Sequence, residues 1–327
     1  MSSDKTVIIT GCAGFLGSHL CRSQLTEKFN VIGIDNLLTG QIKNVNELKQ
    51  QFPSTFHFLE KDVCDDWTDI ESDLKSVSKI ETIYHFASPA SVPHYQKYSL
   101  ETMSVNSIGL KNCLTFANKK NAKVIFASTS EIYGDPQISP QNENYWGHVN
   151  PFGPRSCYDE SKRYGEALIY SWNERFKTQH GIIRIFNTYG PHMNSDDGRV
   201  ILRLLQQALG HKPLTIYGDG LQTRSFCYVD DLIDGIIKYA YSAETRPMNL
   251  GRSDQITIQK LAELIIQLTQ SKSKIQHTGL PVDDPRHRWP DLNFARTALN
   301  YNATTNLTTG LTKMISWLTQ KDLNDQK

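Results

Sequence analysis

The sequence has no excess of charge of either sign, since 35 lysine and arginine residues stand against 34 aspartate and glutamate residues. With a formal net charge of +1, nothing indicates nucleic acid or an acidic membrane surface as a partner. There is also no apolar run of about eighteen residues, and the N-terminus "MSSDKTVIIT" has no signal-peptide pattern. We therefore expect no membrane span and no secretion.

Cysteine is scarce and scattered. The six cysteines contain no Cys-x-x-Cys pair, so a disulfide framework is not predicted and the thiols are expected to be reduced, as in the cytoplasm. No histidine and cysteine cluster has the spacing of metal ligands, so we expect no metal site. Internal repeats and low-complexity segments are missing too, which argues against a solenoid.

What the chain does contain is a regular alternation of short apolar runs and segments of helical length. The runs are "TVIIT", "NVIGID", "FHFLEKDV", "TIYHFAS", "KVIFASTS" and "GIIRIFNT". Nearly continuous apolar strands with helices between them are typical of a parallel sheet that is covered on both faces. The sequence therefore predicts an α/β fold with a Rossmann-type doubly wound parallel sheet.

The rhythm changes after about residue 188, where shorter elements with more glycine and proline begin. A helical pattern in "DDLIDGIIKYAY", followed by "MNLG", indicates a return to the first domain. We expect a cofactor domain of residues 1–187 plus about 226–251. A smaller, discontinuous substrate domain would then comprise 188–225 plus 252–327.

A glycine-rich turn, "TGCAGFLG", joins the first strand to a helix. Gly11, Gly14 and Gly17 would let the backbone approach a pyrophosphate at the helix N-terminus, although the same glycines could serve only a tight turn. Asp35 ends the second strand, where a carboxylate accepts hydrogen bonds from both adenosine ribose hydroxyls and repels a 2'-phosphate. This pattern favours NAD over NADP. Asp62 could reach the adenine or be a turn residue.

Tyr158 and Lys162 lie four residues apart at a predicted helix start, in "GPRSCYDESKRYGE". On one helix face, the ammonium would favour the ionised phenol. A tyrosine base near neutral pH needs its pKa lowered by about three units, or roughly 4 kcal/mol. Lys162, the charge of the nicotinamide and the Thr129 hydroxyl could together provide that shift.

These motifs resemble the extended short-chain dehydrogenase/reductase family across essentially the whole chain. The longer blocks "HFASPAS", "STSEIYGDP", "YWGHVNPFGPRSCYDESKRYGE", "GLQTRSFCYVDDL" and "DDPRHRWPDL" resemble the UDP-glucuronate decarboxylases within it, also called UDP-xylose synthases. The resemblance implies oxidation at C4 of the sugar by NAD, loss of carbon dioxide from the 4-keto intermediate, and hydride return. It also implies a homodimer formed through helices that include the Tyr/Lys helix.

The resemblance also assigns roles to single residues. For catalysis it implies Tyr158, Lys162, Thr129, Ser130, Glu131 and Arg288. For the cofactor it implies Gly11, Gly14, Phe15, Leu16, Gly17, Asp35, Asn36, Asp62, Val63, Phe86, Ala87, Asn106, Tyr158 and Lys162. For the UDP-sugar it implies Tyr95, Asn112, Asn187, Arg199, Tyr217, Gln222, Arg224 and Arg288, with Arg288 and Tyr95 near the sugar carboxylate.

Two alternatives on the same scaffold are a sugar 4,6-dehydratase and a 4-epimerase, and a third is a catalytically silent NAD-binding interaction protein. Ser130 stands where dehydratases carry an aspartate that protonates the leaving hydroxyl, and a carboxylate clamp of Arg288 and Tyr95 favours decarboxylation over epimerisation. The presence of Tyr158 and Lys162 argues against a catalytically silent protein. Cys12, Ser161, His192 and Trp289 depart from the family pattern.

Overall fold

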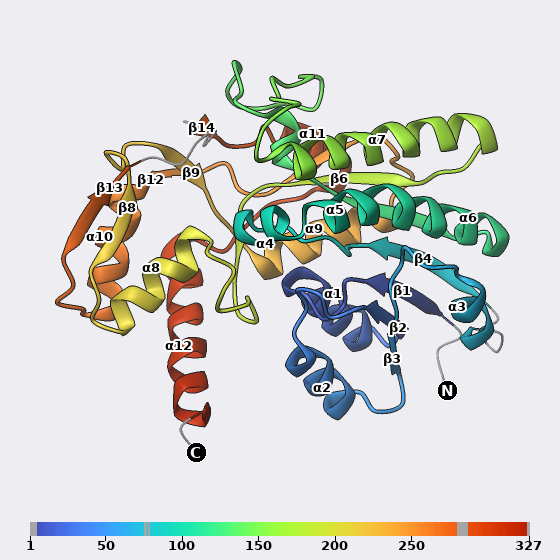
Figure 1. Ribbon diagram of the computed structural model, residues 1–327, viewed down its shortest axis with the longest axis horizontal. Coiled ribbons are helices and arrows are strands. Elements are labelled where there is room, and N and C mark those ends of the chain that lie inside the picture. The colour runs from blue at the N-terminus through green and yellow to red at the C-terminus, as the bar shows by residue number, and fades with distance from the viewer. Residues whose placement is uncertain (1–4, 75–76, 78, 280–286, 326–327) are drawn as a thin grey trace.

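Seven parallel strands form the central sheet in the computed structural model of the protein, which describes residues 5–74, 77, 79–279 and 287–325 (Figure 1). The strands run in the order β11-β6-β5-β4-β1-β2-β3, and every neighbouring pair is parallel. Their bounds are β1 (Thr6–Thr10), β2 (Asn30–Asp35), β3 (Phe56–Glu60), β4 (Ile80–His85), β5 (Lys123–Thr129), β6 (Gly181–Ile185) and β11 (Met248–Leu250). The six predicted apolar strands and the fold class are thus confirmed, and "MNLG" supplies a seventh strand, β11, to the same sheet.

Successive residues of one strand pack into different cores, which is why the strands read as continuously apolar. Val7 and Ile9 belong to one buried cluster and Ile8 to the other. The first core lies under α1 (Phe15–Thr26), α2 (Ile42–Gln51), α9 (Val229–Tyr241) and α11 (Asn293–Leu299). The second lies under α3 (Thr68–Asp73), α6 (Leu110–Lys120) and α7 (Ser156–Phe176); in Figure 1, α7 is drawn above β6, and α6 between β6 and β4.

A long helical segment crosses the second face in three pieces. It consists of α5 (Ser99–Ser104), a π-helical turn η1 (Val105–Gly109) and α6, and it is preceded by α4 (Val92–Lys97). Single π-helical turns often occur at functional sites. Here the turn carries Asn106, whose side chain is buried.

The remaining elements lie beyond the carboxyl ends of the sheet strands. They are η2 (Ser130–Tyr133), β7 (Thr188–Tyr189), α8 (Val200–Leu209), β8 (Leu214–Tyr217), β9 (Thr223–Ser225), β10 (Cys227–Tyr228), β12 (Gln255–Thr257), α10 (Ile258–Thr269), β13 (Ile275–Thr278), β14 (His287–Arg288) and α12 (Leu307–Asp325). Except for η2, β7 and β10, they gather at the left of Figure 1 or at its upper edge. The division into two domains stays a prediction.

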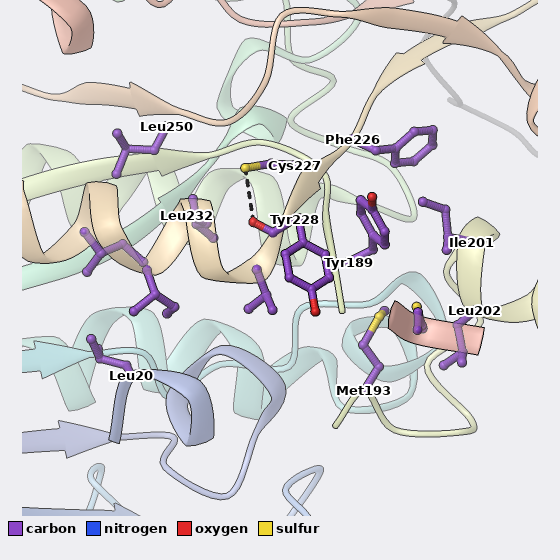
Figure 2. Close-up of a cluster of buried hydrophobic side chains, with 14 of the residues drawn as sticks. Leu20, Tyr189, Met193, Ile201, Leu202, Phe226, Cys227, Tyr228, Leu232 and Leu250 are labelled. Carbon is purple, nitrogen blue, oxygen red and sulfur yellow. Dashed lines mark hydrogen bonds between the residues drawn. The ribbon is translucent and has the colours of Figure 1, made fainter. Parts of the chain in front are cut away.

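A buried aromatic cluster joins these elements to the sheet (Figure 2). Tyr189 and Tyr228 pack edge to face, with ring centroids 5.7 Å apart. Leu20 of α1 and Leu232 of α9 belong to the same core. The helix that follows the glycine-rich turn therefore shares a core with Tyr189 and Tyr228, which lie outside the central sheet.

All six cysteines are unpaired. Within the described ranges, no helix is long and apolar enough to cross a membrane.

Candidate active site

The glycine-rich turn forms one wall of a cavity of about 340 Å³ at the carboxyl end of the sheet. Gly11 has a φ of +75°, and a Cβ there would lie 2.7 Å from the backbone of Phe86 and Ala87. A Cβ on Gly17 would lie 2.0 Å from the Gly11 carbonyl oxygen. Gly11 therefore permits the turn and the close approach to β4, whereas Gly17 permits close packing of α1 on the turn.

Several predicted cofactor residues line this cavity. They are Gly11, Gly14, Asp35, Asn36, Asp62, Val63, Phe86 and Ala87. Phe15 and Leu16, at the start of α1, instead pack against the first core. The cavity lies beside β1 and β4, where the strand order reverses, which is where doubly wound sheets bind ligands.

Two carboxylates of the cavity are held by backbone and amide donors. Asp35 accepts from the Ala13 amide at 3.0 Å and the Leu37 amide at 2.8 Å. Burial raises the pKa of Asp35, and these two hydrogen bonds oppose the increase. Asp62 accepts from the Asn36 side chain at 2.8 Å and the Cys64 amide at 2.8 Å.

Two asparagines that the sequence assigns to ligand binding, Asn106 and Asn112, form hydrogen bonds to residues around this cavity. Asn106 donates to the hydroxyls of Ser88 (3.1 Å) and Ser161 (3.0 Å), and so connects a cavity residue to the Tyr/Lys helix. The serine at position 161 is thus a hydrogen-bond partner within the fold. Asn112 donates to the carbonyl oxygens of Val63 and Asp65, both at 3.0 Å, which fixes the loop after β3.

Tyr158 and Lys162 are both buried on α7. The Lys162 Nζ donates to the Ala127 carbonyl at 2.8 Å and lies 5.7 Å from the centre of the Tyr158 ring. Burial raises the pKa of Tyr158 to about 12, although its hydrogen bond with the Thr129 hydroxyl lowers it. Burial also lowers the pKa of Lys162 to about 7. Without the cofactor, desolvation thus disfavours the charged forms of both side chains, and the lowering of the phenol pKa that the sequence predicts, which includes the charge of the nicotinamide, stays a prediction.

A buried charge cluster lies next to Tyr158 and comprises Glu131, Arg155, Asp159 and Arg288. Arg155 Nη2 contacts Glu131 Oε2 at 2.6 Å, and Arg288 Nη1 contacts Glu131 Oε1. Burial raises the pKa of Glu131, but Arg288 and Arg155 outweigh it and leave the value below normal. Burial and the charge of Glu131 raise the pKa of Asp159 to about 7, against the effect of the two arginines.

One edge of the Arg288 guanidinium is left open within this cluster. Its Nε and Nη2 are buried and have no hydrogen-bond partner among the described residues. These two donors form a single edge, which matches the two oxygens of a carboxylate. The Tyr95 hydroxyl is also buried and has no hydrogen-bond partner in the described part of the chain, and its ring stacks on Tyr158. An unmet set of buried donors is costly unless a ligand satisfies it.

Arg288 reaches this position because two contacts hold its strand. Residue 288 pairs with Arg224 in the parallel ladder of β14 and β9. The buried Gln141 side chain accepts from the Trp289 amide at 2.9 Å, and the Gln141 amide donates to the Trp289 carbonyl at 3.1 Å. The loop after η2 and the segment after β14 are therefore joined across the charge cluster.

The predicted nucleotide residues lie farther along the same side of the sheet. Gln222 donates to the Tyr217 carbonyl at 2.8 Å, and Arg203 lies over the Tyr217 ring at 4.4 Å. Arg224 lowers the pKa of Glu131, and Arg199 lowers that of Tyr158. These two arginines are thus within electrostatic reach of the reactive groups. The Asn187 carbonyl accepts from the Cys227 amide at 2.9 Å, in the loop that leaves β6.

Sequence reasoning did not assign Arg155, Asp159 or Arg203 to the site. The first two lie in the segment "GPRSCYDESK" beside Tyr158, but no spacing rule identifies a partner on a distant element. Of the departures from the family pattern, Cys12 is buried against Gly33. His192 lies 3.5 Å from the Glu47 carboxylate and 5.7 Å from the Trp317 ring, away from the charge cluster.

Comparison with known proteins agrees with this geometry. Residues 7–251 match the model of the "NAD dependent epimerase/dehydratase family". The chain is 40% identical to UDP-glucuronic acid decarboxylase 1 of Danio rerio, over 97% of this chain and 73% of that protein. It is also 40% identical to UDP-glucuronic acid decarboxylase 5 of Arabidopsis thaliana, over 95% of this chain and 89% of that protein.

A solved structure gives the same result for the fold. UDP-glucuronic acid 4-epimerase from Bacillus cereus, in complex with UDP-glucuronic acid and NAD, superposes with a TM-score of 0.84 at 28% identity. The match covers 97% of this chain and 99% of that one. The chain therefore belongs to the NAD dependent epimerase/dehydratase family.

Proposed function

We propose that the protein is an NAD-dependent UDP-glucuronate decarboxylase that produces UDP-xylose. The observation that carries this proposal is the open edge of Arg288, whose Nε and Nη2 are buried and find no hydrogen-bond partner among the residues that the structure describes. The unpartnered Tyr95 hydroxyl lies on the stacked pair of tyrosines that includes Tyr158. A sugar carboxylate bound there would satisfy these donors and bring the ring to the phenol.

The cavity beside β1 and β4 fits a dinucleotide. Its glycine wall has no side chain at Gly11 and Gly14, and the Asp35 carboxylate lies across from it as a ribose partner. NAD, when bound, would supply the electron acceptor for C4 of the sugar and a positive charge near the phenol. We propose that the residues named above for the cofactor hold it.

The chain's own residues would then handle protons and orientation. Tyr158 would take the proton of the 4-hydroxyl, with the Thr129 hydroxyl and Lys162 stabilising the phenolate. Oxidation at C4 makes the C6 carboxylate part of a β-keto acid, so carbon dioxide can leave while the C4 carbonyl accepts the electrons of the broken C5–C6 bond. Protonation at C5 and return of the same hydride to C4 would then give UDP-xylose with NAD regenerated. Arg288 and Tyr95 would hold that carboxylate, and Glu131 would orient Arg288 through their ion pair.

The carboxylate clamp does not separate this reaction from every epimerisation, contrary to the expectation from sequence. The Bacillus cereus 4-epimerase is itself bound to UDP-glucuronic acid, so a 4-epimerase of the same substrate is the second candidate. Decarboxylation is favoured because decarboxylases are the relatives at 40% identity, against 28% for that epimerase. Ser130 at the aspartate position of dehydratases argues against loss of water.

Incubation of the purified protein with UDP-glucuronate and NAD tests the proposal. Mass spectrometry should detect a nucleotide sugar lighter by one carbon dioxide. A product of unchanged mass with inverted C4 would instead establish the epimerase. Loss of water from TDP-glucose in a parallel reaction would establish the dehydratase, and no turnover of either sugar would support a silent binding protein.

We also propose a cytoplasmic homodimer. Large apolar side chains are exposed on the α5 to α7 surface, including Leu100, Met103, Ile108, Tyr164 and Tyr170. Such a surface is typical of an interface between copies. The six unpaired thiols are compatible with a reducing compartment.

A further inference from the structure

The buried charge cluster contains one carboxylate that the reaction above does not use, Asp159. We propose that Asp159 takes up a proton when a carboxylated sugar binds, so that the cluster remains electrically balanced. This inference rests on the proposed function, because it assumes that the third carboxylate comes from the substrate.

Asp159 is buried, and its carboxyl group has few hydrogen-bond partners in the described part of the chain. Its side chain is 5% exposed, and its Oδ1 has no hydrogen-bond partner among the described residues. Glu131, in contrast, is held by both Arg155 and Arg288. The described titratable groups that interact with Asp159 are Tyr95 of α4, Glu131 of η2, Arg288 of β14, and Arg155, Cys157, Tyr158 and Glu160 on or next to α7.

The charges of the cluster balance before the substrate arrives. Arg155 and Arg288 carry two positive charges, and ionised Glu131 and Asp159 carry two negative ones. Of the charges around these four groups, the cation Arg224 acts on Glu131 and the anion Glu160 acts on Asp159, so this pair leaves the balance unchanged. A glucuronate carboxylate on the open edge of Arg288 would add a third negative charge in a buried space, which is unfavourable unless it is compensated. A proton on one carboxyl group restores the balance.

Asp159 is the group best placed to receive that proton. Protonation of Glu131 would weaken contacts to two guanidinium groups, whereas Asp159 makes no ion pair within 4.0 Å among the described residues. Its pKa of about 7, raised by burial and by Glu131, puts the carboxyl close to titration already. Another nearby anion raises a carboxyl pKa further.

Isothermal titration calorimetry can count the protons. The NAD-loaded Tyr158→Phe variant, which cannot turn the sugar over, would be titrated at pH 8 in two buffers of different ionisation enthalpy. We expect uptake of about one proton per UDP-glucuronate bound and about none for UDP-glucose, which lacks the carboxylate. Equal uptake with both sugars would overturn the inference, and this comparison requires no change at position 159.

A second variant then locates the proton. When Asp159→Asn is added to the Tyr158→Phe variant, proton uptake on binding of UDP-glucuronate should vanish. The affinity of Tyr158→Phe for UDP-glucuronate should fall by about tenfold per pH unit above the Asp159 pKa, and this fall should be lost in the double variant. Glu160→Gln is the matched control, since Glu160 is the next carboxylate on α7 and lies 3.6 Å from Arg163. Unchanged uptake in Asp159→Asn, with normal UDP-glucose binding, would refute the assignment.

The outcomes for the two proposals are distinguishable. If UDP-glucuronate binds no better than UDP-glucose and the wild-type enzyme releases no carbon dioxide, the proposed function fails. If UDP-glucuronate binds and is decarboxylated without proton uptake, only the role of Asp159 fails.

Discussion

The phenol rings of Tyr95 and Tyr158 lie parallel, with centroids 5.0 Å apart and planes 7° from each other. The stack connects α4, which carries the unpartnered Tyr95 hydroxyl, to α7, which carries the proposed base. In the proposed reaction, carboxylate binding and proton abstraction would therefore share one pair of side chains.

Tyr95→Phe should preserve this stack and remove only the hydroxyl. Loss of a hydrogen bond to a charged group should lower kcat/KM for UDP-glucuronate by about 10- to 100-fold. The melting temperature should not fall, because the buried hydroxyl has no hydrogen-bond partner to lose among the described residues. Steady-state kinetics and thermal denaturation test this. Tyr170→Phe, on the exposed side of α7, should match the wild type in both measurements.

Arg288→Ala should lower kcat/KM for UDP-glucuronate by about 100-fold or more, since it removes a buried cation that binds a charged group. Arg288→Lys should recover little, because an ammonium lacks the two-donor edge. NAD affinity, measured by fluorescence titration, should not change in either variant. Arg246→Ala, which removes a largely exposed arginine paired with Glu244, is the control. Normal turnover by Arg288→Ala would show that the clamp is assigned to the wrong residue.

Lys162 should make stability depend on pH. Its pKa is about 7 in the fold because of burial, against about 10.4 in an unfolded chain. Between these values the unfolded state binds more protons, so the contribution of Lys162 to the free energy of unfolding rises with pH by at most about 1.4 kcal/mol per unit. Urea denaturation should show that, between pH 7.5 and 9.5, the free energy of unfolding of the wild type rises relative to that of Lys162→Met. A constant difference would contradict the shift.

Gly17→Ala should destabilise the protein by about 3 kcal/mol or more, because the new Cβ would lie 2.0 Å from a backbone oxygen. Denaturation curves with and without NAD should show both a lower midpoint and weaker stabilisation by the cofactor. At Gly279 no heavy atom of the described residues lies within 4 Å of a Cβ position. Gly279→Ala should therefore be nearly neutral, and an equal loss in both variants would rule out the packing explanation.

Ile108→Asp should shift the protein from dimer to monomer, because it places a charge on the apolar surface of α5 to α7 where Ile108 is 51% exposed. Light scattering coupled to size-exclusion chromatography measures the change. Leu221→Asp alters a comparably exposed residue, at 66%, outside that surface and should leave the mass unchanged. A wild-type monomer would refute the proposed homodimer.

The sheet could be predicted because its signal is local. Each of the six predicted strands is a continuous apolar run, whereas β11, only three residues long, is too short to give such a signal. The residues next to the glycine loop could be predicted for the same reason, because the carboxyl ends of neighbouring parallel strands meet at one edge.

The charge cluster could not be predicted in full, because its contacts join distant parts of the chain. Glu131 and Arg288 are 157 positions apart. The sequence around either residue contains no pattern that predicts its contact with the other. Arg155 and Asp159 resemble ordinary polar residues of a helix start. The direction of the Tyr158 pKa shift also depends on burial, which helical spacing does not report.

The pairing of Arg288 with Glu131 has a consequence for the order in which the molecule is assembled. A growing chain completes six of the seven central strands by residue 185 and the last by residue 250, and N-terminal regions generally fold first during synthesis. The cofactor cavity can therefore form while Arg288 is still unsynthesised. A nascent chain should acquire its dinucleotide site before it can discriminate between sugars.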